Sequence, residues 1–255
     1  MMNEHKLTIS SKSGESLNAI LYESSPEDKN KPPLLIMCHG FTGDKFEHGS
    51  FPSTAKVANV EKIDVLIFDF SGSGENRRVP IRLYQQIDDL ESVFQWSRDQ
   101  GYEDIAVLGL SFGGLTLIGA DLPGINLYVF WAPVLFLHTT GERTSYFKDL
   151  DKGPVEVPSD AIGGPVIIEM SFLTDFAKLN VKKHLKKVEV PVLMVQGTAD
   201  EETPHELTKK AYEQLPSNEN HAFITVQGAP HNFTEEYEKE FINPTVEWLA
   251  KFFKK

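Results

Sequence analysis

The chain has 255 residues, and its 37 Asp and Glu residues outnumber its 25 Lys and Arg residues to give a formal net charge of −12. This length suffices for one domain with a sizeable core, so we expect residues 1–255 to form a single domain. The acidic balance argues against nucleic acid and anionic membranes as partners. A lone cysteine, Cys38, excludes an internal disulfide, and it lies in an apolar strand-like segment where we expect a core residue.

No apolar run reaches the length of a membrane span, and residues 1–6 contain no apolar segment of the kind found in signal peptides. We therefore expect a cytoplasmic protein that does not associate with membranes. The sequence leaves open whether the chain acts as a monomer or as a homodimer.

The predicted elements begin with two short alternating segments, 6–10 and 17–22, which predict an antiparallel hairpin. A polar, proline-rich loop follows over residues 24–33. From there, strand-like and helix-like segments alternate. Strands are predicted at 34–38, 65–70, 105–110, 127–131, 192–196 and 221–226, and helices near 53–60, 83–98, 112–120, 206–215 and 244–253. Uniformly apolar strands that alternate with helices are typical of an α/β fold, with a mostly parallel central sheet covered by helices on both faces.

The alternation breaks between Pro133 and Pro191. This segment is rich in Gly and Pro and carries scattered aromatic residues. A stretch of this length without regular pattern is usually functional or disordered. We interpret residues 134–190, approximately, as a small cap-like insertion over the carboxyl ends of the strands. A plain surface excursion is the alternative.

Residues 109–113 read Gly-Leu-Ser-Phe-Gly, between an apolar strand and an apolar helix. This Gly-x-Ser-x-Gly pattern is typical of a nucleophile elbow, in which Ser111 occupies a sharp, strained turn with its hydroxyl exposed. Gly109 and Gly113 are then required because a Cβ at either position would collide with neighbouring backbone. The alternative is a glycine-rich turn with a buried serine.

A serine nucleophile requires a base and an acid, which we seek after other strands because ligands of open α/β sheets bind at the carboxyl ends of the strands. Asp200 follows strand 192–196, and His231 follows strand 221–226. Histidine titrates near neutral pH and can accept the serine proton, while a carboxylate orients the imidazole. We predict that Ser111, His231 and Asp200 act together, with Glu201 and Glu202 as spectators.

The oxyanion of a tetrahedral intermediate needs two backbone N–H donors. We expect one from Phe112, the residue after the nucleophile. The other should come from Phe41, in the loop after strand 34–38, where Gly40 allows close approach of the backbone. We expect His39 to support this loop rather than transfer protons.

Taken together, these segments resemble the α/β-hydrolase family over nearly the whole chain. His39-Gly40-Phe41 resembles its oxyanion motif, residues 69–74 its Asp-x-x-Gly-x-Gly loop, and residues 109–113 its elbow. Within the family, the chain looks most like bacterial cinnamoyl or feruloyl esterases and related carboxylesterases, which also carry an insertion over the site. Monoacylglycerol-lipase-like members share the same motifs. Ser73 stands where the family usually has histidine, and Phe112 where Gln, Met or His is commoner.

The sequence therefore predicts a serine esterase that cleaves small-molecule esters of short-chain or hydroxycinnamoyl acids through an acyl-enzyme. A monoacylglycerol-lipase-like hydrolase and a non-catalytic binding protein of the same fold are the alternatives. No dinucleotide-binding spacing, phosphate loop or zinc-ligand spacing occurs, so we expect no cofactor and no metal. The expected aromatic lining of the substrate pocket comprises Trp131, Phe136, Tyr146, Phe172 and Phe176.

Overall fold

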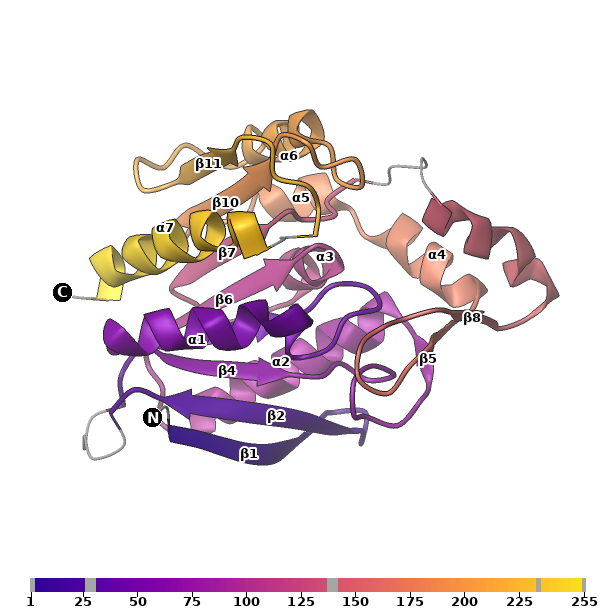
Figure 1. The fold of residues 1–255 in the computed structure, drawn as a ribbon, viewed down its shortest axis with the longest axis horizontal. Coiled ribbons are helices and arrows are strands. Elements are labelled where there is room, and N and C mark those ends of the chain that lie inside the picture. Colours follow the sequence, from indigo (N-terminus) through magenta and orange to yellow (C-terminus); the bar gives the residue numbers. More distant parts are fainter. Residues whose placement is uncertain (1–2, 26–30, 137–141, 233–234, 254–255) are drawn as a thin grey trace.

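The structure is a computed structural model, and it describes residues 3–25, 31–136, 142–232 and 235–253. These form a central eight-stranded sheet in the order β1-β2-β4-β3-β6-β7-β10-β11 (Figure 1). The strands are β1 (Asn3–Ser10), β2 (Ser16–Glu23), β3 (Leu34–Cys38), β4 (Asp64–Phe68), β6 (Ile105–Leu110), β7 (Leu127–Trp131), β10 (Val192–Gly197) and β11 (Ala222–Val226). The β1–β2 and β2–β4 pairs are antiparallel and the remaining pairs are parallel. The predicted sheet, with a hairpin at one edge, is confirmed.

Helices cover both faces of this sheet (Figure 1). On one face, α1 (Ser50–Val60) and α7 (Glu235–Phe253) pack against one apolar cluster. On the other, α2 (Leu83–Asp99), α3 (Phe112–Gly119), α5 (Val181–Leu185) and α6 (His205–Tyr212) pack against a second cluster. Residues of β3 contribute alternately to the two clusters, and all of them, Cys38 included, are fully buried. Burial on both faces explains why the central strands are almost uniformly apolar.

Two helices begin earlier than the sequence predicts. Helix α1 starts at Ser50, and α7 starts at Glu235 and carries Pro244 in its interior. Proline lacks the N–H of a helical hydrogen bond and usually starts a helix rather than interrupting one. Here Phe241 and Ile242, in the turn before the proline, are buried against the sheet. This packing holds the helix together on both sides of Pro244.

The segment between β7 and β10 contains short regular elements that the sequence did not predict. They are η2 (Glu142–Lys152), β8 (Val155–Val157), β9 (Val166–Ile168), α4 (Met170–Lys178) and α5. Strand β9 pairs with β8 and, in parallel, with β5 (Pro80–Ile81) of the chain before the insertion. Figure 1 shows η2, α4 and β8 beyond the end of the sheet to which the arrows of β4 and β6 point. The insertion is thus joined by backbone hydrogen bonds to a segment outside itself.

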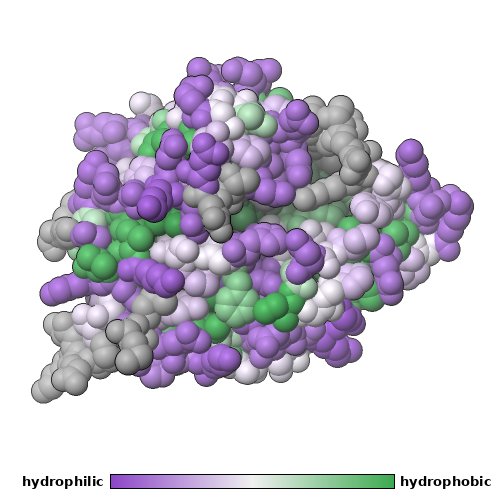
Figure 2. Space-filling model, in the orientation of Figure 1, coloured by the Kyte–Doolittle hydropathy of each residue, from purple (hydrophilic) through white to green (hydrophobic). Residues whose placement is uncertain are grey.

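The visible face of the molecule is mainly hydrophilic, with hydrophobic residues in separate patches (Figure 2). Large apolar side chains are exposed at only a few described positions, which include Val60, Ile162 and Met170. Among the described helices, none combines the length and the apolar character that crossing a membrane requires.

Candidate active site

Ser111 lies at a tight turn between β6 and α3, with φ 50° and ψ −116°. Residues with a Cβ seldom adopt this conformation, and its strain is typical of functional sites. A Cβ on Gly109 would lie 2.5 Å from the Gly113 carbonyl oxygen, and one on Gly113 would lie 2.4 Å from that of Cys38. Both glycines are therefore required for the reason that the sequence suggested, and the elbow is confirmed as a structure.

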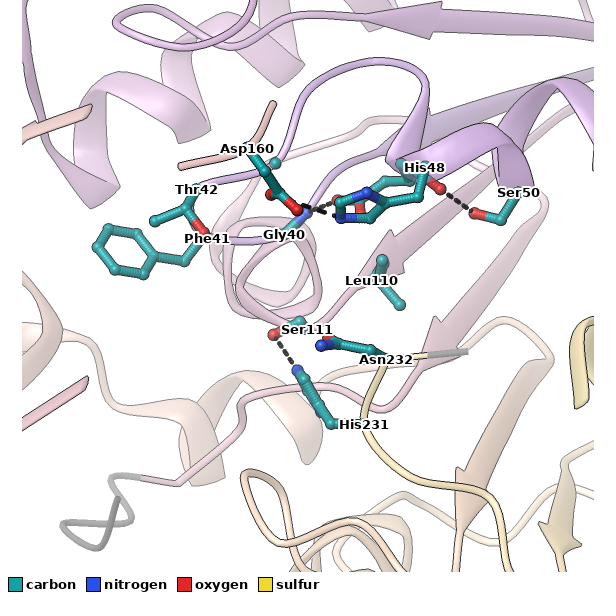
Figure 3. Close-up of a pocket in the computed structure, with 12 residues that line it drawn as sticks. Gly40, Phe41, Thr42, His48, Ser50, Leu110, Ser111, Asp160, His231 and Asn232 are labelled. Atoms are coloured by element: carbon teal, nitrogen blue, oxygen red, sulfur yellow. Dashed lines mark hydrogen bonds and ion pairs between the residues drawn. The ribbon is translucent and has the colours of Figure 1, made fainter. Parts of the chain in front are cut away.

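A chain of hydrogen bonds joins Ser111, His231 and Asp200. Ser111 Oγ lies 2.9 Å from His231 Nε2, and His231 Nδ1 lies 2.9 Å from Asp200 Oδ2. The three residues follow β6, β11 and β10, and each is less than a tenth exposed. Figure 3 shows the Ser111 hydroxyl facing the imidazole. The structure thus brings together the three residues that the sequence singled out.

The Asp200 carboxylate has further partners that no sequence motif marks. Its Oδ2 accepts hydrogen bonds from Thr203 Oγ1 at 2.7 Å and Gln196 Nε2 at 2.8 Å, and its Oδ1 accepts from the backbone N–H groups of Thr203 and Glu202. Burial raises the pKa of Asp200, but the hydrogen bond and charge of His231 and the donors from Thr203 outweigh it and hold the pKa below its usual value. The carboxylate is therefore ionised at neutral pH.

The loop after β3 passes directly over Ser111. A Cβ on Gly40 would lie 3.3 Å from Ser111 Cβ, so glycine permits this close approach. Phe41 follows in the same loop, and Phe112 is the first residue of α3. Among the described residues, neither Phe41 N–H nor Phe112 N–H has a hydrogen-bond acceptor. Both groups are thus available to a ligand beside the serine.

His39 supports this loop from within the core, as the sequence predicted. Its side chain is 1% exposed and lies edge-on to the Phe70 ring. Its Nε2 accepts a hydrogen bond from Phe70 N–H at 3.1 Å, so its Nδ1 carries the hydrogen and donates to the Gly40 carbonyl at 2.8 Å.

A cavity of about 310 Å³ opens at Ser111 and His231 (Figure 3). Its wall includes polar side chains that the sequence analysis did not single out: Glu47, His48, Ser50, Asp160 and Asn232. Asp160 comes from the insertion, and its Oδ1 lies 3.9 Å from His48 Nε2. The sequence indicated that Glu47 and His48 lie at this cavity only through their closeness, along the chain, to the predicted oxyanion loop.

None of the five aromatic residues predicted to line the pocket lies in the wall of the Ser111 cavity. The prediction that Trp131 lines the pocket is wrong. Its side chain is fully buried in the cluster beneath α1 and α7, where its ring packs on Phe241 and its Nε1 donates a hydrogen bond to Thr245. Its position at the end of β7 was predicted, but the face to which it points was not. Phe136 faces a small separate cavity beside Thr203.

Tyr146 and Phe176 pack, partly buried, on the cluster that lies beneath α2 and α3, and they do not line the Ser111 cavity. Phe172 does not line that cavity either, but it lies next to the elbow. Its ring stacks on Phe112 at 5.2 Å and packs on Phe41 at 5.0 Å. Phe172 therefore contacts both of the residues expected to supply oxyanion donors.

Other charged candidates lie at the margin of the site. The Glu202 carboxylate is 3.7 Å from His231 Nε2, whereas the Asp200 carboxylate is hydrogen-bonded to Nδ1. His205, on α6, pairs with Thr225 at 2.9 Å and does not line the Ser111 cavity. His205 is thus not placed to act as the base.

Comparison with known proteins shows the family to which the chain belongs. Residues 35–243 match the sequence model of the alpha/beta hydrolase family. This chain belongs to that family. An Escherichia coli relative, named only as an uncharacterized 31.7 kDa protein in the traX-finO intergenic region, is 26% identical over 274 residues, which cover 90% of this chain and 93% of the relative.

Solved structures resemble the whole chain. Est1E from Butyrivibrio proteoclasticus, with ferulic acid bound, superposes with a TM-score of 0.79 at 21% identity, covering 98% of this chain and all of Est1E. DcsB, solved with a substrate analogue, has a TM-score of 0.81 at 21% identity with the same coverage. These likenesses establish the α/β-hydrolase fold, and together with the family they support a hydrolase.

Proposed function

We propose that this protein is a serine esterase that hydrolyses carboxylic esters of short-chain or hydroxycinnamoyl acids. The observation that carries the proposal is the unbroken hydrogen-bond chain from Ser111 through His231 to Asp200 at the wall of a cavity. In this arrangement the imidazole can take the serine proton while the oxygen attacks a carbonyl carbon. A protein that only binds a ligand has no need for such a base.

In the proposed reaction, Ser111 Oγ attacks the ester carbonyl and His231 Nε2 accepts its proton. The N–H groups of Phe41 and Phe112 stabilise the oxyanion of the tetrahedral intermediate. His231 then protonates the departing alcohol, which leaves the acyl group on Ser111. A water molecule, deprotonated by the same imidazole, attacks this acyl-enzyme, and the imidazolium returns the proton to Ser111 Oγ as the acid is released. Asp200 stays ionised and stabilises the imidazolium in both steps.

The proposed acyl preference rests on the aromatic residues beside the elbow. Phe172 packs on Phe41 and Phe112, and the ring centre of Phe147 lies 5.9 Å from that of Phe172. In Figure 3 the Phe41 ring points to the opposite side from His48 and Ser50. The site thus has an aromatic side and a polar side, which suits a short or aryl acyl group better than a long lipid chain.

The test is a substrate panel of p-nitrophenyl esters from acetyl to decanoyl, with methyl ferulate and a monoacylglycerol. Ferulic acid in the Est1E structure makes methyl ferulate the first hydroxycinnamoyl ester to try. We expect the highest kcat/KM for short acyl chains or ferulate. A preference for the monoacylglycerol or for long acyl chains would favour the lipase-like alternative.

Labelling with a fluorophosphonate separates an enzyme from a binding protein. We expect the reagent to label Ser111 in the wild type, and Ser111→Ala to lose labelling and at least ~10⁴-fold of the ester hydrolysis. An unlabelled, inactive wild type would favour a binding protein. A Ser111→Ala variant with a tenth of the wild-type rate would exclude Ser111 as the nucleophile.

A further inference from the structure

The carboxylate of Glu47 packs against the turn that carries Phe41. Glu47 Oε1 accepts a hydrogen bond from Gly40 N–H at 2.5 Å. A Cβ on Gly43 would lie 2.4 Å from the same oxygen and would displace the carboxylate from this position. Gly43 N–H donates to the Gly40 carbonyl at 3.2 Å and closes the turn around Phe41 and Thr42. The carboxylate therefore touches both ends of this turn.

Glu47 reaches this position through a strained backbone. Its φ is 43°, and that of His48 is 53°, both in the left-handed region that residues with a Cβ seldom adopt. Gly49 follows with φ 97°, and α1 begins directly after it. Such strain persists only where the surrounding structure imposes it, and it gathers at functional sites. Two consecutive strained residues beside the Ser111 cavity point to a role for the side chains that they position.

The contacts of Gly40 explain what Glu47 holds. A Cβ on Gly40 would crowd Ser111, and glycine avoids this contact but leaves the backbone at this position less restricted than any other residue would. Glu47 binds the Gly40 N–H and so fixes the peptide plane before it. His39 binds the Gly40 carbonyl and so fixes the plane after it, which contains the Phe41 N–H. Among the described side chains, Glu47 is the one that accepts a hydrogen bond from an N–H of this turn.

We propose that Glu47 is a positioning residue for the oxyanion hole: by accepting the Gly40 N–H, it fixes the backbone of Gly40 so that Phe41 N–H points at the developing oxyanion. The inference rests on the esterase function proposed above. Glu47 acts through the turn, so we expect the affinity for a neutral ester not to depend on it. An amide oxygen at this position can accept the same hydrogen bond.

The test compares Glu47→Ala and Glu47→Gln with the wild type on p-nitrophenyl acetate. A misplaced donor loses part of the ~10²–10³-fold that one oxyanion donor contributes. We expect Glu47→Ala to lower kcat by about 10- to 100-fold with KM within about threefold. Glu47→Gln should stay within about threefold of wild-type kcat because it keeps the acceptor. Glu219→Ala, at an exposed residue before β11, is the matched control and should behave as the wild type.

A second readout follows the oxyanion directly. An alkyl trifluoromethyl ketone forms a tetrahedral adduct with serine, so its Ki in Glu47→Ala should rise by the factor by which kcat/KM falls. Should Glu47→Ala fold poorly, Glu47→Gly removes the carboxylate from a backbone that glycine adopts without strain, and the same loss of kcat is expected.

Several results overturn the inference. Unchanged kcat in Glu47→Ala would show that the turn needs no acceptor. A raised KM with unchanged kcat would make Glu47 a substrate contact, and a Glu47→Gln variant as slow as Glu47→Ala would make its charge the important property. An unchanged Ki for the trifluoromethyl ketone would show that Glu47 does not affect stabilisation of the oxyanion. A wild type inactive on all esters would instead overturn the proposed function, and this inference with it.

Discussion

Four hydrogen-bond donors besides His231 hold the Asp200 carboxylate, and they come from Gln196, Glu202 and Thr203. With both oxygens occupied, the carboxylate cannot rotate, so Oδ2 stays aimed at His231 Nδ1. A fixed acceptor on Nδ1 forces that nitrogen to carry the hydrogen and leaves Nε2 free to accept the serine proton.

We predict that Asp200→Asn lowers kcat for p-nitrophenyl acetate by about 10⁴-fold, because an amide cannot both stabilise the imidazolium and hold the required tautomer. The fold, checked by circular dichroism, should be retained. Glu201→Gln, at the exposed neighbouring position, is the control and should stay close to the wild-type rate. Equal losses in the two variants would refute the assignment of Asp200.

The sequence predicts a functional residue where the chemistry dictates both its type and its position. Ser111, Asp200 and His231 were predictable because each follows a strand that ends at the same edge of the sheet. Gln196 and Thr203 were not, because they depend on the path of one loop around a carboxylate. Trp131 shows a different limit: the end of β7 was located within a residue, but the face that its side chain takes was not.

Among the elements, the insertion is the part that pattern analysis described least well. Its strands have three residues each and its two α-helices nine and five, too few to show a clear period. The first half of α7 was missed because Pro244 resembles a helix start, whereas burial of Phe241 extends the helix through it. The long, doubly buried strands and α2 were predicted within a few residues.

The insertion also contacts the loop that carries Phe41. Ser159 Oγ donates to the Thr42 carbonyl at 2.6 Å, and Ile162 N–H donates to Asp44 Oδ2 at 2.7 Å. These two hydrogen bonds join residues more than a hundred positions apart. The insertion therefore supports the same turn that Glu47 supports.

We predict that Ser159→Ala lowers kcat on p-nitrophenyl acetate by about 3- to 10-fold, since one of the contacts that hold this turn is lost. Ser171→Ala is a matched control in the same insertion, because the buried Ser171 hydroxyl has no hydrogen-bond partner among the described residues. It should leave kcat unchanged. Equal rates for the two variants would show that the insertion does not influence the turn.

For the molecule as a whole, we expect one buried carboxyl group, that of Asp89, to contribute to the pH dependence of stability. Asp89, on α2, is fully buried and accepts hydrogen bonds from Ser71 N–H, Ser71 Oγ and Gln85 Nε2. Burial outweighs these donors and raises the pKa of Asp89 to about 6. In the unfolded chain an aspartate titrates near ~3.9, so the folded state binds this proton more tightly. Stability therefore falls as pH rises from about 4 to about 6.

We predict that ionisation of Asp89 lowers the free energy of unfolding by about 2 kcal/mol between pH 4.5 and pH 7. Asp89→Asn has no such proton, so its stability should change with pH only through the remaining groups. Urea unfolding of both proteins at the two pH values measures the difference, and the comparison of slopes holds even if the variant is less stable throughout. Parallel pH dependences would show that Asp89 titrates as an ordinary carboxyl.

The net charge of −12 also bears on which esters reach the site. Glu47 and Asp160 line the cavity at Ser111, so an anionic substrate meets negative charge both over the surface and at the entrance. Charge of one sign around a cleft changes association rates by about 10- to 10³-fold, and salt weakens the effect as the screening length shrinks from roughly 10 Å at 0.1 M to 3 Å at 1 M.

We therefore predict that p-nitrophenyl hydrogen succinate, an anion at neutral pH, has at least about tenfold lower kcat/KM than the neutral p-nitrophenyl butyrate of similar length at low salt. The gap should narrow as sodium chloride is added, and Asp160→Asn should narrow it at low salt, because that variant removes a charge at the cavity wall without shortening the side chain. A gap that salt does not change would assign the discrimination to shape. A preference for the anion would show that cations outside the described residues or elsewhere on the surface govern substrate approach.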